Sequence, residues 1–179
     1  MRFLPTPLAG VYRIELAPHR DERGTFARLF CRHEFAAHGL ADVLAQVNVS
    51  YTRQRGTVRG LHYQAPPHAE AKLVCCIAGA IYDVIVDLRP GSPTYLQHVA
   101  LWLAAGEACA VYVPEGCAHG FQTLTDDAGV LYGMSTFYAP QHARGVRYDD
   151  PLLAIAWPLP ISVVAERDRG WPLLPAARR

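Results

Sequence analysis

The sequence alternates between short apolar segments and turns that carry glycine or proline, with 14 residues of each type. The apolar segments are Val47–Tyr51, Leu73–Ile77, Ile81–Leu88, Val99–Leu103, Ala110–Val113 and Val130–Phe137. Strands of this length, spaced roughly ten residues apart, are typical of a β sandwich or barrel. A helix is expected at Arg32–His38, where Gly39 ends it, and it is too short to cross over between parallel strands. The sequence therefore predicts an all-β fold with a few short helices.

Composition and charge exclude several classes of protein. The 179 residues are 51% apolar and 18% charged, which suits one domain with a large core. Seventeen Lys and Arg against sixteen Asp and Glu give a net charge of +1, so we expect neither a nucleic-acid partner nor a membrane-surface partner. Residues 1–13 lack the layout of a secretory signal and no long apolar run is present, so we expect a cytoplasmic protein. Five cysteines without a CxxC spacing disfavour a disulfide framework or a zinc ribbon.

Polar residues alternate with apolar ones along two of the expected strands. Side chains of a strand point to its two faces in turn, so Gln46, Asn48 and Ser50 share one face. Tyr132 and Tyr138 likewise share a face of the later segment. Such a stripe either faces solvent or lines a barrel wide enough to hold a ligand. Alternation alone leaves both interpretations open.

Two stretches contain residues suited to chemistry. Arg59–Gln64 reads Arg-Gly-Leu-His-Tyr-Gln, and Pro114–Phe121 reads Pro-Glu-Gly-Cys-Ala-His-Gly-Phe. Together they resemble the two motifs of the cupin superfamily, a histidine-bearing strand followed by a PxGxxH stretch. The resemblance implies a cupin-type jelly roll, also called a double-stranded β-helix barrel, with residues 1–179 as one domain.

The first of these motifs departs from the pattern of metal-binding cupins. In those proteins it supplies two histidines and a glutamate, and the second motif supplies a third histidine. Here Gln64 and Lys72 occupy the places of the second histidine and the glutamate, so His62 and His119 remain. A lysine ammonium has no lone pair for a metal and repels a cation at close range. We therefore expect no metal, and a cavity that accepts an anionic or enolate-like species.

A closer resemblance covers nearly the whole chain, from about Pro7 to Asp168. It is carried in order by Asp21–Phe26, Arg59–Gln64, Val86–Arg89 with Ser92–Thr94, Pro114–Phe121, and Asp149–Pro151 with Trp157–Pro158. These stretches resemble the dTDP-4-dehydrorhamnose 3,5-epimerase family. The resemblance implies an isomerase that epimerises a nucleotide-linked 4-keto-6-deoxyhexose, without a cofactor, through an enolate. The leading substrate is dTDP-4-dehydro-6-deoxyglucose.

The same resemblance implies the catalytic residues. His62 matches the base that removes the proton next to the ketone, and a histidine is suitable because its ordinary pKa of about 6.5 leaves it mostly neutral. Asp168 matches the carboxylate that accepts the Nδ1 proton of this histidine. Tyr132 matches the general acid. Lys72, the single lysine of the sequence, is suited to hold the enolate oxygen.

Further residues are implied to bind the substrate and to form the dimer. The resemblance implies that Arg23 and Arg59 hold the diphosphate, because guanidinium groups suit phosphate oxygens. The expected substrate-binding residues are Arg23, Phe26, Gln46, Asn48, Arg59, His119 and Tyr138. Arg23 and Phe26 are implied to reach the partner's site, with strands of about residues 1–30 exchanged in a homodimer. His119 either hydrogen-bonds the same oxygen as Lys72 or is a structural remnant of a metal-binding ancestor.

Several questions stay open at this stage. Gly133 follows Tyr132 where rhamnose-pathway members usually carry lysine, which leaves open whether C3, C5 or both are inverted. Ala27 and Arg28 stand where those members place a base-reading glutamate, so thymidine is the leading base among several. A 3,4-ketoisomerase and a non-catalytic sugar-binding cupin are the alternatives, and a metal-dependent dioxygenase is the least favoured. From about residue 149 to 179 the prolines predict an extension packed over the barrel, with a short helix at Ile161–Asp168.

Overall fold

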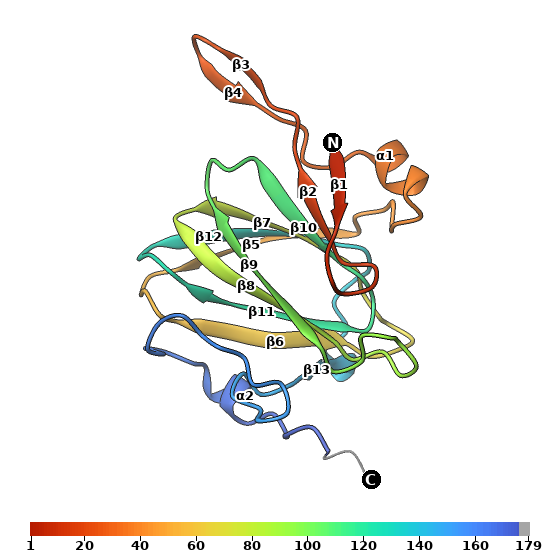
Figure 1. Ribbon diagram of the computed structural model, residues 1–179, viewed down its shortest axis with the longest axis vertical. Helices are drawn as coiled ribbons and strands as arrows, with labels where there is room; N and C mark the ends of the chain where they lie inside the picture. The colour runs from red at the N-terminus through yellow and green to blue at the C-terminus, as the bar shows by residue number, and fades with distance from the viewer. Residues whose placement is uncertain (176–179) are drawn as a thin grey trace.

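The computed structural model describes residues 1–175, in which two antiparallel sheets pack face to face (Figure 1). The six-stranded sheet contains, in spatial order, β1 (Arg2–Pro5), β2 (Tyr12–Glu15), β10 (Cys109–Val113), β7 (Lys72–Ala78), β12 (Ala128–Met134) and β5 (Gln46–Thr52). The five-stranded sheet contains β13 (Ala143–Gly145), β6 (Val58–Gln64), β11 (Cys117–Thr123), β8 (Ala80–Asp87) and β9 (His98–Ala104). The predicted all-β, cupin-type fold is confirmed.

The main core lies between the two sheets. Val74, Val111 and Val130 from the six-stranded sheet meet Ile85 and Phe121 from the five-stranded sheet, and all five side chains are buried. Burying β-branched and aromatic side chains from both inner faces is the main source of stability in a sandwich of this kind. The core fills one part of the space between the sheets and leaves the part near β5 and β6 for polar residues.

The direction of the polar stripe on β5 is now settled. Val47, Val49 and Tyr51 are exposed, so the alternate residues, among them Gln46 and Asn48, face the inside of the sandwich. Strand β12 pairs with β5 in register, with Tyr132 opposite Asn48. The stripe lines the interior of the barrel, which is the second of the two interpretations above.

The helices differ in part from the sequence prediction. Helix α1 (Arg32–Ala37) forms where it was expected, and its Phe35 is buried against the outer face of the six-stranded sheet. The helix predicted at Ile161–Asp168 is wrong for its first half, because Val164 forms a parallel bridge with Val58 and keeps the chain extended. Helix α2 (Glu166–Arg169) begins only after this bridge, and a short 3-10 turn, η1 (Pro140–His142), precedes β13. No helix of the described residues is long and apolar enough to span a membrane.

The segment after β13 covers the outer face of the five-stranded sheet. Leu153, Ile155 and Trp157 pack there against residues such as Leu61 and Val84. The last four residues of the predicted extension, 176–179, lie outside the described residues. This arrangement brings the C-terminal segment alongside β6, where the candidate site lies.

The N-terminal region has two parts. Strand β2 pairs with β1 on one side and with the chain's own β10 on the other. The hairpin of β3 (His19–Asp21) and β4 (Gly24–Phe26) instead projects from the sandwich at the top of Figure 1, and all its residues are exposed. The exchange between subunits stays a prediction.

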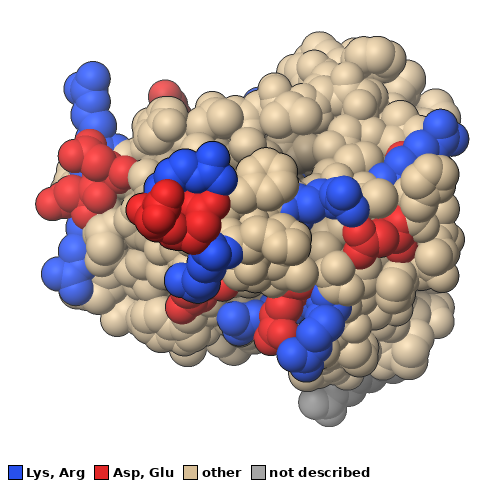
Figure 2. Space-filling view, turned by 90° about the horizontal axis from the view of Figure 1, so that it is seen from above, with Lys and Arg blue, Asp and Glu red and all other residues tan. Residues whose placement is uncertain are grey.

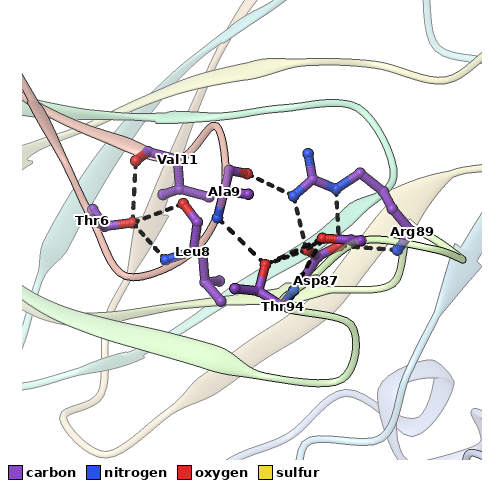
Figure 3. Close-up of polar contacts among 8 residues, drawn as sticks. Thr6, Leu8, Ala9, Val11, Asp87, Arg89 and Thr94 are labelled. Atoms are coloured by element: carbon purple, nitrogen blue, oxygen red, sulfur yellow. Dashed lines mark hydrogen bonds and ion pairs between the residues drawn. The ribbon is translucent and has the colours of Figure 1, made fainter.

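A buried carboxylate ties the first turn of the chain to the loop after β8 (Figure 3). Asp87 accepts hydrogen bonds from the Arg89 guanidinium at 2.8 Å and from the Thr94 hydroxyl at 2.6 Å. Arg89 Nη2 also donates to the backbone oxygen of Ala9 at 2.6 Å. Burial acts to raise the pKa of Asp87, but these donors outweigh it and hold the pKa far below its usual range.

Charged side chains of both signs are mixed on the surface. On the face seen in Figure 2, the lysine and arginine side chains lie beside aspartate and glutamate, and uncharged surface separates these groups. This agrees with the balanced composition of the sequence. A field of one sign, which steers nucleic acids, does not build up on this face.

Candidate active site

A cavity of about 740 Å³ lies inside the sandwich, a size that suits a small-molecule ligand. Every predicted site residue except Arg23 and Phe26 lines it, namely Gln46, Asn48, Arg59, His62, Lys72, His119, Tyr132, Tyr138 and Asp168. These residues come from both sheets and from α2, so the fold brings together positions that are far apart in the sequence. Glu70, Met134, Arg144 and Arg167 also line the cavity, and sequence reasoning did not select them.

His62 and Asp168 form a hydrogen-bonded pair. The imidazole Nε2 lies 2.6 Å from Asp168 Oδ1, and the Gly60 N–H donates to Oδ2 at 3.1 Å. The expected contact through Nδ1 is wrong: α2 lies alongside β6, and the bond from Gly60 holds the carboxylate where it meets the far nitrogen of the ring. Nδ1 is left as the second ring nitrogen, and the His62 side chain is 43% exposed, which makes it accessible from the cavity.

Asp168 is buried yet ionised. Burial acts to raise the pKa of its carboxyl, and the hydrogen bonds from His62 and Gly60 act against burial and hold the pKa below its ordinary value. A carboxylate in this position fixes the tautomer of the imidazole and stabilises the imidazolium when the ring takes up a proton.

The backbone explains how Asp168 reaches β6. Val58 N–H donates to Val163 O at 2.9 Å, and Ser162 N–H donates to Gly56 O at 3.0 Å. These bonds add a short parallel stretch to the edge of the site and place α2 next to the middle of β6. The prolines of this segment predicted an extension, but no sequence signal gives its pairing partner.

Tyr132 lies on β12 with its side chain inside the sandwich. Its hydroxyl is 3.0 Å from Ser50 Oγ, a contact that joins β12 to the polar face of β5. Burial raises the pKa of Tyr132 to about 12, so the phenol stays protonated at neutral pH. A protonated phenol in a cavity is a proton donor.

His119 belongs to a second histidine–aspartate pair. Its Nε2 lies 2.6 Å from Asp83 Oδ1, and both side chains are buried. The ring of Tyr132 lies edge-on to that of His119, with 6.2 Å between the ring centres. Sequence reasoning missed Asp83, although an acidic residue within the apolar run Ile81–Val86 was a signal for a buried partner.

Lys72 is a buried ammonium with two partners. Its Nζ lies 3.2 Å from Glu70 Oε1 and donates to the backbone oxygen of His62 at 2.8 Å. Burial lowers the pKa of Lys72, and the negative charges of Glu70 and Asp83 act in the opposite direction. Sequence reasoning missed Glu70, which stands two residues before the single lysine. Because its carboxylate balances the ammonium, the Lys72–Glu70 pair has no net charge.

The polar residues at the edges of the cavity are also tied down. Arg59 Nε donates to Thr52 Oγ1 at 2.8 Å, and Gln46 Oε1 accepts from the Tyr138 N–H at 2.6 Å. The Tyr138 side chain is exposed, because β12 ends at Met134 instead of continuing to Phe137 as the sequence predicted. The backbone there turns away to bond Ala71 and Gln46 before it reaches Pro140.

Arg23 and Phe26 lie apart from this chain's own cavity. Both are on the β3–β4 hairpin, where Arg23 pairs with Asp21 and Phe26 is 74% exposed. An exposed phenylalanine on a projecting hairpin has no packing partner within the described residues.

The donor set offers little to a metal ion. His62 and His119 each have Nε2 engaged by a carboxylate, and Gln64 bonds the backbone of His68 and Ala139. Among residues 1–175 no group of three or more His, Cys, Asp or Glu is arranged to hold a metal. The expectation of a metal-free site stays a prediction, which metal analysis of the purified protein tests.

The fold and the cavity together define a cupin-type protein with ionisable side chains gathered inside its barrel. The family model of dTDP-4-dehydrorhamnose 3,5-epimerase matches residues 5–176. A Sinorhizobium fredii protein named dTDP-4-dehydrorhamnose 3,5-epimerase is 42% identical over 176 residues, which cover 97% of this chain and 90% of that protein. The chain therefore belongs to the dTDP-4-dehydrorhamnose 3,5-epimerase family, an isomerase family.

Two further comparisons bear on the activity. A Streptomyces niveus protein named dTDP-4-dehydrorhamnose 3-epimerase is 41% identical over 179 residues, covering 99% of this chain and 86% of that protein. A solved structure of a Legionella pneumophila 3,5-epimerase in complex with dTDP-4-keto-L-rhamnose superposes with a TM-score of 0.90. It is 35% identical in sequence, with 96% of this chain and 92% of that chain covered.

Proposed function

We propose that the protein epimerises a nucleotide-diphosphate-linked 4-keto-6-deoxyhexose at C3, C5 or both, with dTDP-4-dehydro-6-deoxyglucose as the leading substrate. The observation that carries the proposal is the accessible His62 imidazole, held through Nε2 by the buried Asp168 carboxylate inside a ligand-sized cavity. Family membership and the ligand of the Legionella pneumophila structure support the substrate class.

The first step is removal of a proton next to the ketone. With Nε2–H donated to Asp168, the lone pair of His62 Nδ1 accepts the proton from the sugar carbon. The C–H bonding electrons move to the C4 carbonyl oxygen and form an enolate, while Asp168 stabilises the imidazolium. Because Asp168 lies 2.6 Å from the ring, the positive charge formed on His62 is paired and does not bear the full desolvation cost of a buried charge.

The enolate and the second proton transfer involve the other buried groups. Lys72 places an ammonium in the cavity as a fixed positive charge for the enolate oxygen. His119, whose Nε2 is held by Asp83, lies beside Tyr132 in the wall of the cavity. Tyr132 then delivers its phenolic proton to the opposite face of the carbon, which inverts the centre. Solvent exchange afterwards returns a proton to the phenolate and removes one from the imidazolium.

The diphosphate and the base occupy the edges of the cavity. Arg59 gives a guanidinium for the phosphate oxygens, Gln46 and Asn48 give amide groups, and Tyr138 presents an exposed ring for a flat base. Arg59 and Arg144 have no carboxylate partner within the described residues, so the rim carries uncompensated positive charge that suits a dianion.

A homodimer completes the site in this proposal. Val47, Val49 and Tyr51 form an exposed apolar row on β5, a surface that suits burial against a second copy. The projecting β3–β4 hairpin then carries Arg23 and Phe26 to the partner's cavity, where they add a phosphate ligand and a stacking ring. The exchanged part of residues 1–30 is this hairpin, since β2 pairs with the chain's own β10 and β1 pairs with β2.

We also propose a cytoplasmic location. The five cysteines are all free thiols, as suits a reducing compartment.

Inversion of C3 alone is the second candidate, favoured by the 41% identity to a protein named as a 3-epimerase. The test for both is incubation with dTDP-4-dehydro-6-deoxyglucose in deuterated water. Deuterium at C3 and C5 supports the double epimerase, and deuterium at C3 alone supports the 3-epimerase. Movement of the carbonyl to C3 would indicate a ketoisomerase. Binding without any exchange would indicate a sugar-binding cupin and end the proposal, and His62→Ala is the negative control.

A further inference from the structure

Trp171 follows α2 and occupies the space beside His62. Its indole lies directly on Gly145, where a Cβ atom would collide with the ring. Gly145 is paired with His62 across β13 and β6, and residues paired across two strands point to the same face. The indole therefore fills the position next to the imidazole, although Trp171 does not line the cavity itself.

The indole N–H of Trp171 lacks a hydrogen-bond acceptor among residues 1–175. Trp171 Nε1 is buried and forms no hydrogen bond with any described residue. Buried N–H groups are costly to leave unpaired, so an acceptor within reach is expected to bind this one.

The carboxylate of Asp168, three residues earlier, has the capacity to accept it. Oδ1 receives His62 and Oδ2 receives the Gly60 N–H, which leaves lone pairs on both oxygens. Burial acts to raise the pKa of Asp168, and His62 leads the groups that lower it. Trp171 is the last of these groups, so its indole lies near the carboxylate although the two do not form a hydrogen bond of full geometry.

Two contacts hold the ring and its segment in place. The Arg167 guanidinium lies 5.2 Å from the centre of the indole ring, a cation–π distance. Farther along, the Leu174 N–H donates to the buried Asp150 at 2.6 Å. The indole ring therefore packs between Arg167 and Gly145, and the hydrogen bond of Leu174 fixes the segment that follows it.

We propose that Trp171 is a positioning residue for the His62–Asp168 pair, with its indole N–H as a further donor to the Asp168 carboxylate. The proposal rests on the proposed function only for its effect on catalysis. A donor on Asp168 withdraws negative charge from the bond to His62 and so moderates the basicity of the imidazole. Without it the imidazole is a stronger base and holds its proton to a higher pH.

The direct test observes the three indole N–H groups by nuclear magnetic resonance in the free protein. Trp171→Phe identifies the Trp171 signal. In Asp168→Asn, which removes the charge and keeps the shape, the Trp171 signal is expected to move upfield by several tenths of a part per million. The Trp102 and Trp157 signals are expected to stay. A Trp171 signal that moves no more than theirs overturns the proposal, whatever the protein's activity.

The second test is the pH profile of kcat/KM. Trp171→Phe keeps a ring on Gly145 and loses the N–H. The acid limb of its profile is expected to lie about half a pH unit above that of the wild type, so that kcat/KM on this limb falls roughly threefold. KM is expected to stay within twofold of the wild-type value. Gly145→Ala, which displaces the indole, is expected to move the limb in the same direction. Trp157→Phe is the matched control, because the Trp157 N–H donates to Tyr148 O on the far face of the sheet. A profile of Trp171→Phe that overlays the control shows a purely structural tryptophan.

Discussion

The ammonium of Lys72 donates a 2.8 Å hydrogen bond to the backbone oxygen of His62, and this bond joins the two sheets inside the cavity. Lys72 lies on β7 of one sheet and His62 on β6 of the other. Glu70 holds the same ammonium from the side at 3.2 Å. The charge proposed to receive the enolate is thus fixed relative to the base that creates it, which is the kind of preorganisation that electrostatic catalysis requires.

Removal of this charge is expected to affect both activity and stability. Lys72→Met should lower kcat by about 10²- to 10³-fold, because the enolate oxygen loses its cation. It should also lower the free energy of unfolding by about 3–5 kcal/mol, because Glu70 is left buried and unpaired. Steady-state kinetics and urea unfolding measure the two effects.

The double variant Lys72→Met with Glu70→Gln separates them. It should recover most of the lost stability, because no unpaired carboxylate remains, and none of the lost activity. Equal recovery of both would mean that Lys72 acts only through the fold.

Tyr132→Phe is expected to uncouple proton removal from inversion. The variant keeps His62 and Lys72, so deuterium should still enter the substrate, while the product of inversion should fall by about 10²- to 10⁴-fold. Parallel measurement of deuterium uptake and of product stereochemistry makes the comparison. Loss of both signals to the same extent would assign Tyr132 to binding instead of protonation.

A related expectation concerns the basic limb of the wild-type pH profile of kcat. Burial raises the pKa of Tyr132 to about 12, so the phenol keeps its proton throughout the range in which enzymes are assayed. No loss of kcat between about pH 7 and 10 should therefore arise from Tyr132. A basic limb in that range that disappears in Tyr132→Phe would contradict this expectation.

Asp87 is expected to make stability depend on acid pH. Its folded pKa is held below the unfolded value, so its contribution is complete above about pH 4–5 and is lost as the pH falls towards the folded pKa. Asp87→Asn should cost about 2–3 kcal/mol at neutral pH, the value of hydrogen bonds to a charged group, and should flatten the loss of stability on acidification. Urea unfolding between pH 3 and 7 measures the slope.

Asp149→Asn is the matched control for Asp87. Asp149 also pairs with an arginine two residues away, Arg147, but that pair is on the surface. Its loss should cost within about 1 kcal/mol. Comparable losses in the two variants would show that burial adds nothing to the Asp87 network.

Complementation between two inactive subunits tests the proposed exchange. Arg23→Ala and His62→Ala should each be poorly active alone. In a mixed dimer the His62→Ala subunit lends its Arg23 to the partner's intact cavity, so an equal mixture should recover roughly a quarter of wild-type activity. Recovery after subunit mixing, and none when Tyr51→Glu is added to block association, is the expected pattern. Absence of recovery from mixed dimers confirmed by mass would rule out a shared site.

The sequence predicted the fold well because strand length and turn residues are local properties. It gave the polar stripe of β5 but not its direction, since which face turns inward depends on the pairing with β12. The resemblance selected His62, Tyr132 and Asp168, and the chemistry of a single lysine selected Lys72. The cavity brings all four together. Asp83 stands out in the sequence as an acid within an apolar run, but its partner His119 is known only once the fold is known. Glu70 has no such signal, and its pairing with Lys72 appears only in the structure.

The contact between Asp168 and Nε2 also depended on three-dimensional packing. A carboxylate 106 residues away in sequence reaches the ring by a path that the bridge of Val58 with Val164 determines. The same bridge kept residues before Glu166 extended where local propensity favoured a helix. Both errors have one cause, a long-range pairing that leaves no trace in the adjacent sequence.

All the strands of the described residues lie between Arg2 and Gly145, whereas Asp168 follows more than twenty residues later. During synthesis, every strand of both sheets leaves the ribosome before Asp168, the carboxylate proposed to orient His62. A nascent chain can therefore form the core between its two sheets before the proposed pair of His62 and Asp168 is complete, and the pair forms only after residue 168 has emerged.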